Sequence, residues 1–327
     1  MLRAALLTLL ILVVLPASAS AACRTAPAAN VWYDSPVLQV WADGEGWASC
    51  VRPTNTEHVY RDRGDGPEAR LDFGHVWGDR WITLVREKGY DSDDSSIEYL
   101  GSDTYDALTG QPATGRWGVD AGPQGIVLRH GDGRTEVIDP TPVSEELELV
   151  FQGRRLYWLT PSGPRTALLN VPDEPAPPRA KPLRARKMTN CTPRTGANLL
   201  VRYRRIVVTR KGKSVHACFN KRVTPIGDAR EFQHLGGAAI AYTRPGFAGY
   251  LDANHGPHHE LPSAGGPIAA TFSLLAAVDR RGVLRAWAED RKRPVVLTRG
   301  GASDVVATHY EVFWMAPDRT PRVRKVS

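Results

Sequence analysis

Short apolar runs separated by turn sequences are the main pattern along the chain. Examples are VLQVWA (37–42), WITLVRE (81–87), GIVLRH (125–130) and RRLYWLT (154–160), and the sequences ADGEG, RHGDGR and TPSGP separate such runs. Many runs are rich in β-branched and aromatic residues, and the separating sequences are rich in Gly, Pro and Asp, as expected for strands and turns. No stretch of a dozen residues has a capped apolar period of 3.6 residues. The pattern predicts an all-β protein.

The predicted strands fall into groups of about 30 to 40 residues. In the first half of the chain the groups cover 31–62, 71–110, 117–139 and 146–169. A three- or four-stranded sheet of this size cannot bury both of its faces alone, so it must stack on similar sheets, as the blades of a β-propeller do. The pattern predicts a β-propeller of seven or eight blades, with two separate small β-domains as the alternative.

The second half of the chain repeats the first. The hairpin LQVWADGEGWASC (38–50) aligns with IVVTRKGKSVHAC (206–218) at an offset of 168 residues. WITLVRE (81–87) aligns with AIAYTRP (239–245) at 158, QGIVLR (124–129) with RGVLRA (281–286) at 157, and LYWLTP (156–161) with VFWMAP (312–317) at 156. The falling offset is typical of a tandem duplication followed by small deletions.

The chain resembles secreted bacterial β-propellers of the TolB-like and WD-repeat-like kinds. It shares with them the spacing of its strand groups, its aromatic-bearing strands and its tandem duplication. The resemblance implies a propeller built from two divergent half-propeller modules. We expect the first module at 23–170 and the second at 189–327. Residues 171–188 form a Pro-rich basic linker that includes VPDEPAPPRAKP, a composition typical of an extended spacer.

Residues 1–22 are predicted to be a signal peptide. Arg3 precedes an apolar run, and small residues that offer A-x-A cleavage sites follow it. The other long apolar stretch, 266–278, is shorter than the roughly 18 residues that a transmembrane helix needs. We therefore expect a secreted or extracytoplasmic protein without a transmembrane segment.

The four cysteines outside the signal peptide form two equally spaced pairs. Cys23 and Cys50 are 27 residues apart, as are Cys191 and Cys218. Because the spacing recurs in both copies and export permits oxidation, we predict one disulfide within each copy. Lipid attachment at Cys23 is the alternative.

Charge separates the two halves. Residues 1–170 hold 15 basic and 23 acidic residues, whereas residues 171–327 hold 27 basic and 12 acidic ones. The basic residues either balance the acidic copy or bind a polyanion, and the anionic polymers of the cell envelope are more plausible partners than nucleic acid for an exported protein. The candidate polyanion-binding residues are Arg202, Arg204, Arg205, Arg210, Lys211 and Lys213.

Candidate catalytic chemistry is sparse, and we assign no catalytic residue. The stretch DANHGPHHE offers possible ligands of a divalent metal cofactor: Asp252, His255, His258, His259 and Glu260. The corresponding acidic loop, 91–98, lacks the glycine and glutamate of an EF-hand loop, and both loops also read as solvated turns. The sequence therefore favours an exported binding or scaffold module that contacts an anionic polymer or a protein partner. The alternative is a metal-dependent hydrolytic propeller enzyme centred on 255–260.

Overall fold

The computed structural model describes residues 23–326, apart from eleven short internal segments: 45, 62–68, 78, 90–96, 113–116, 131–132, 144–148, 173–177, 188–190, 205 and 254–257. Apart from the 3₁₀ turn η1 (Ala28–Asn30), every regular element in this part of the chain is a β-strand. The all-β prediction is therefore confirmed. Among the described residues, no helix has the length and apolar character needed to cross a bilayer.

The first copy forms four groups of antiparallel strands. They are β1 (Val31–Asp34), β2 (Leu38–Asp43), β3 (Gly46–Val51) and β4 (Thr56–Tyr60); β5 (Ala69–Trp77), β6 (Trp81–Gly89) and β7 (Ile97–Asp106); β8 (Gly118–Gly122), β9 (Gly125–Arg129) and β10 (Thr135–Asp139); and β11 (Val150–Gln152), β12 (Arg155–Thr160) and β13 (Gly163–Leu168).

The second copy repeats this arrangement. Its groups are β14 (Leu183–Arg184), β15 (Asn198–Tyr203), β16 (Ile206–Lys211), β17 (Ser214–Phe219) and β18 (Arg222–Pro225); β19 (Glu231–Gly236), β20 (Ala239–Arg244), β21 (Phe247–Asp252) and β22 (His258–Pro262); β23 (Ala269–Ala270), β24 (Leu274–Val278), β25 (Leu284–Ala288) and β26 (Val295–Thr298); and β27 (Ser303–Ala307), β28 (Glu311–Met315) and β29 (Pro321–Lys325).

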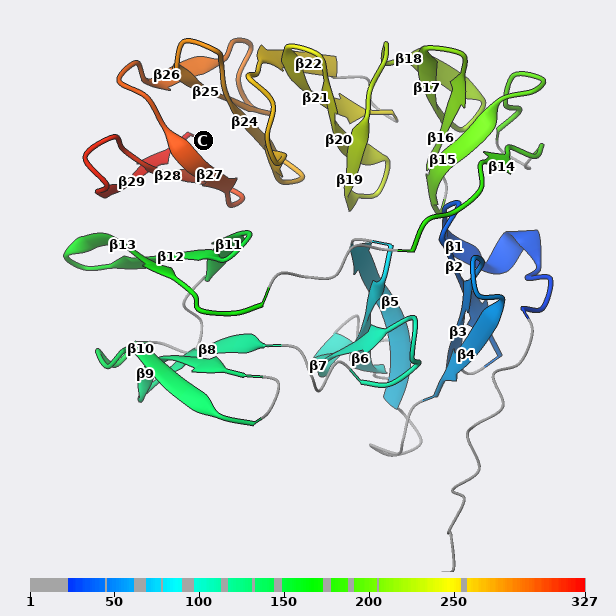
Figure 1. Ribbon diagram of the computed structural model, residues 1–327, viewed down its shortest axis with the longest axis horizontal. Helices are drawn as coiled ribbons and strands as arrows, with labels where there is room; N and C mark the ends of the chain where they lie inside the picture. Colours follow the sequence, from blue (N-terminus) through cyan, green and yellow to red (C-terminus); the bar gives the residue numbers. More distant parts are fainter. Residues whose placement is uncertain are drawn as a thin grey trace, which may run out of the picture.

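The two copies lie side by side, each as a series of four strand groups (Figure 1). The chain passes through the first series from β1 to β13, returns across the molecule through the linker region, and passes through the second series in the same direction. As a result, β15 pairs with β1, and β27 and β29 contact β11 and β13. The fifth strand group therefore lies beside the first, and the eighth beside the fourth. In a sequential propeller ring the fifth group would follow the fourth, and this difference arises because the linker carries the chain back to its start.

The two copies contact each other at two junctions. At the first, β15 pairs with β1, and at the second, β27 and β29 contact β11 and β13. Equivalent residues of the two copies meet at both. Between β1 and β15, Asp34 lies opposite Arg202, its counterpart at the offset of 168. Between β12 and β28, the ring of Tyr157 packs against that of Phe313, its counterpart at 156, with 5.8 Å between centroids. Contact between equivalent residues is the mark of an isologous, two-fold interface. The repeated phrases LYWLTP and VFWMAP thus build the second junction.

A large buried cluster spans the first junction. It includes Tyr33 and Ile82 from the first copy and Tyr203, Ile240 and Tyr242 from the second. Other clusters lie between neighbouring strand groups of one copy, such as that of Leu128 and Trp158, and another joins Tyr157 to Phe313 across the second junction. Burial is therefore continuous from one copy to the other.

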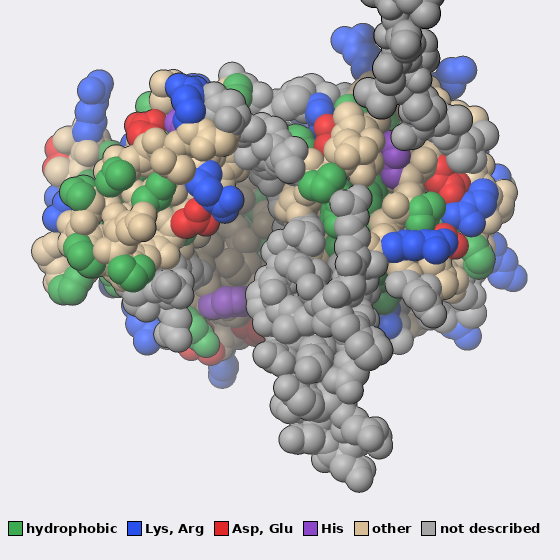
Figure 2. Space-filling view, turned by 90° about the horizontal axis from the view of Figure 1, so that it is seen from below, with side chains coloured by type: hydrophobic (Ala, Val, Ile, Leu, Met, Phe, Trp, Pro, Cys, Tyr) green, Lys and Arg blue, Asp and Glu red, His purple; other side chains and the backbone are tan. Residues whose placement is uncertain are grey.

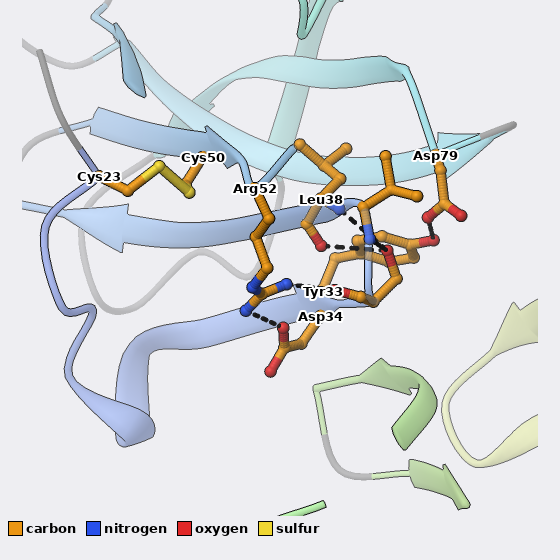
Figure 3. Close-up of polar contacts among 9 residues, drawn as sticks. Cys23, Tyr33, Asp34, Leu38, Cys50, Arg52 and Asp79 are labelled. Carbon is orange, nitrogen blue, oxygen red and sulfur yellow. Dashed lines mark hydrogen bonds and ion pairs between the residues drawn. A yellow bond between two sulfur atoms is a disulfide. The ribbon is translucent and has the colours of Figure 1, made fainter. Parts of the chain in front are cut away.

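Polar contacts fix the turn between β1 and β2 at this junction (Figure 3). The Arg52 guanidinium donates to the Asp34 carboxylate at 2.6 Å and to the Ser35 carbonyl oxygen. The Tyr33 hydroxyl donates to Asp79, in the turn before β6. Burial raises the pKa of Asp34, and the nearby Arg52 opposes that shift. The carboxylate is thus held at the junction by an arginine of its own copy.

The structure contains both disulfides that the cysteine spacing predicts, Cys23–Cys50 and Cys191–Cys218, with Cα–Cα distances of 5.5 and 6.0 Å. The first joins β3 to the segment before β1, and the second joins β17 to the segment before β15. Closing a loop of this length contributes roughly 3 kcal/mol in the chain-entropy model. Such bonds are typical of an oxidising compartment.

Candidate anion-binding site

A shallow pocket of about 510 Å³ lies at one end of the β19–β22 and β23–β26 groups. Its walls come from the β20–β21 turn, the residues after β22, the β24–β25 turn and the segment after β26. Four of its nine lining residues are arginines and one is an aspartate. The lining residues are Gly246, Pro262, Ser263, Asp279, Arg280, Arg281, Val283, Arg285 and Arg299.

Asp279 organises the β24–β25 turn. Its carboxylate accepts hydrogen bonds from the backbone N–H groups of Arg281 at 2.8 Å and Val283 at 3.0 Å, and it forms an ion pair with Arg285. These contacts, the Arg285 hydrogen bond first, lower the pKa of Asp279. The carboxylate therefore stays ionised, and one aspartate both shapes the turn and neutralises one of the four arginines.

Gly282 allows two segments beside the pocket to approach each other closely. Gly282 has a φ of +75°, and a Cβ atom built on it would lie 3.1 Å from the Cα of Gly301, in the loop after β26. A side chain at position 282 would thus push apart the two segments that carry Arg281 and Arg299. This close approach holds the DRRG turn (279–282) beside the RGG segment (299–301).

The remaining arginines, Arg280, Arg281 and Arg299, are exposed, and within the described part of the chain no carboxylate pairs with them. Guanidinium groups gathered on one rim repel each other and bind a phosphate or carboxylate through charge-assisted hydrogen bonds. Figure 2 shows the molecule from below, where basic and acidic side chains lie close to one another at several places. The pocket is therefore a concentrated positive site.

The basic residues predicted from the sequence lie elsewhere, and several serve the fold. Arg202 donates to the carbonyl oxygens of Arg204 and Ala28, at the first junction. The Arg204 guanidinium lies 4.1 Å from the ring centroid of Trp32.

The other predicted basic residues are in the β16–β17 hairpin. Arg210 donates to the carbonyl oxygen of Ala229 at 2.6 Å. Lys211 and Lys213 are exposed at the turn, and Arg205 lies outside the described residues. The five described residues therefore lie at two places, the end of β15 and the β16–β17 hairpin.

Strand alternation divides the predicted metal ligands. His258 and Glu260 share one face of β22, where Tyr242 contacts both side chains and Arg244 pairs with Glu260. These contacts, that of Arg244 first, lower the pKa of Glu260.

His259 lies on the other face of β22 and stacks on Trp287, with 4.0 Å between ring centroids. Asp252 is buried at the end of β21, and His255 lies outside the described residues. Within the described part of the chain, no group of three or more His, Cys, Asp or Glu side chains is placed to hold a metal ion.

The arginine pocket was not among the sequence predictions. The features of the sequence that mark this pocket are the two arginines of the DRRG turn and the arginine before two glycines at 299–301. The strand pairing that brings positions 18 residues apart to one rim is not visible in the sequence.

No family model matches the chain, and no curated protein is significantly similar to it in sequence. It is similar to a solved structure of a mitotic checkpoint complex (8% identity, 92% of this chain and 88% of that chain covered, TM-score 0.25). It is also similar to a solved structure of U3-55K (10% identity, 95% of this chain and 81% of that chain covered, TM-score 0.26). A third similar structure is that of a eukaryotic initiation factor (10% identity, 93% of this chain and 86% of that chain covered, TM-score 0.27). Similarity at this level says nothing about function.

Proposed function

We propose that the protein is an exported binding module that holds an anionic ligand in the arginine pocket of its second copy. The observation that carries the proposal is the rim of Arg280, Arg281 and Arg299, exposed beside Asp279, which is already paired with Arg285. A pocket with an excess of three positive charges favours phosphate or carboxylate groups over neutral ligands. The two disulfides and the predicted signal peptide support a location outside the cytoplasm, where envelope polymers carry such groups.

Long-chain inorganic polyphosphate is a suitable first probe, with neutral dextran as the uncharged comparison. We expect the full chain to bind polyphosphate and not dextran, with an affinity that falls steeply with salt because bound counterions are released. Replacing Arg280 and Arg281 with serine should weaken binding at least tenfold and flatten the salt dependence.

The control is the replacement of Lys211 and Lys213 with serine, which removes two exposed basic residues from another glycine-containing turn. This variant should keep most of the affinity. Full binding by the Arg280 and Arg281 variant would contradict the proposal. Loss of binding only in the lysine variant would place the polyanion site on the β16–β17 hairpin instead.

A further inference from the structure

A second cavity adjoins the arginine pocket. It has a volume of about 270 Å³ and lies among the last three strand groups of the second copy. Ser263 lines both cavities, and Val278, which lines the second cavity, precedes Asp279 of the arginine pocket in the sequence. The two spaces therefore meet along the β24–β25 hairpin and the segment after β22.

Strand pairing places one residue of each cavity side by side. Ala277 lies directly opposite Arg285 in the β24–β25 pair, and cross-strand partners project from the same face. Ala277 lines the second cavity, whereas Arg285 lines the arginine pocket. The lining of the second cavity therefore adjoins that of the arginine pocket.

The second cavity is lined mainly by small apolar residues. Eleven of its fifteen lining residues are Ala, Gly, Val or Pro, and the space exists because these side chains are short. Its one charged residue, Asp304, is paired with Arg155 of the first copy at 3.0 Å. The cavity thus offers an aliphatic chain apolar contacts, and the rim beside it offers positive charge.

We infer that the ligand is an amphiphilic anion, with its anionic head on the arginine rim and a short aliphatic chain in the alanine-lined cavity. This inference rests on the proposed anion-binding function and narrows its ligand class. A uniformly charged polymer would leave the apolar cavity empty, whereas an alkyl phosphate would fill both spaces. Each buried methylene should strengthen binding about fourfold.

The test compares n-hexyl phosphate, inorganic phosphate and n-hexanol as ligands of the full chain, by calorimetry at constant ionic strength. We expect hexyl phosphate to bind at least tenfold more tightly than phosphate, and hexanol to bind weakly because it lacks the head group. Replacing the exposed Ala264, which lines the cavity, with leucine should remove most of that preference and leave phosphate affinity within twofold.

Ala28→Leu, at an exposed alanine of the first copy, is the matched control and should change neither affinity. If Ala264→Leu unfolds the protein, Ser303→Leu, at an exposed residue on the cavity wall, takes its place.

Equal binding of phosphate and hexyl phosphate would overturn the inference and leave the anion site intact. Retained preference in the cavity-filling variant would also overturn it. Failure of phosphate, hexyl phosphate and polyphosphate to bind would instead refute the proposed function itself.

Discussion

Asp34 and Arg202 occupy the same position in the two copies of the repeat and lie opposite each other where β1 pairs with β15. At the axis of an exact two-fold interface the same residue would face itself. An aspartate or an arginine in both copies would then place like charges together, which is unfavourable across a strand pair. Here the two positions instead carry opposite charges, so part of the charge asymmetry between the halves stabilises the junction.

Reversing the charge at this position should destabilise the protein. Asp34→Arg places a cation between Arg202 and Arg52, both close to the Asp34 position. We expect the free energy of unfolding, measured in urea, to fall by roughly 2–4 kcal/mol, because a partly buried carboxylate is lost and like charges are brought together.

The control is Asp120→Arg, which breaks an ion pair with Arg129 in which both side chains are more than half exposed. Such surface pairs are worth about 1 kcal/mol or less. Equal losses in the two variants would mean that the junction does not depend on this charge.

Acid should weaken the contacts of Glu260 on β22. Its pKa is lowered in the folded protein, so this contribution is present above its unfolded pKa and is lost as pH falls through the folded value. Glu260→Gln should therefore lose less thermal stability than the parent protein between pH 6 and pH 3, as measured by Tm. Glu289→Gln, at an exposed loop position, should follow the parent curve. Parallel curves for Glu260→Gln and the parent protein would contradict this assignment.

The disulfide of the second copy should stabilise the fold independently of that of the first. Replacing Cys191 and Cys218 with serine should lower the free energy of unfolding by about 3 kcal/mol, because the unfolded chain regains the freedom of a 27-residue loop. Chemical denaturation of the oxidised parent and the variant measures this difference. A variant as stable as the parent would show that neighbouring strands alone fix this segment.

The sequence predicted local structure well because local patterns carry that information. Short apolar runs and turn residues located strands such as 81–87, and equal spacing predicted both cysteine pairs. The order in which the strand groups pack was not predictable, because a duplicated chain can close end to end or lie against its own copy, and both arrangements bury the same strand faces. The arginine rim was missed for the same reason, since Arg281 and Arg299 meet only through the pairing of β24, β25 and β26.

The two halves, produced as separate chains, should associate with each other rather than with themselves. Alone, residues 23–170 would expose the pairing edge of β1 and the apolar ring of Tyr157, so we expect an aggregating or non-cooperatively folded product. Co-expression with residues 178–327 should give a soluble one-to-one complex, measurable by light scattering, because only the mixed pair sets Asp34 against Arg202. Asp34→Arg in the first half should weaken that complex. A monomeric first half with a cooperative thermal transition would instead favour two independent β-domains.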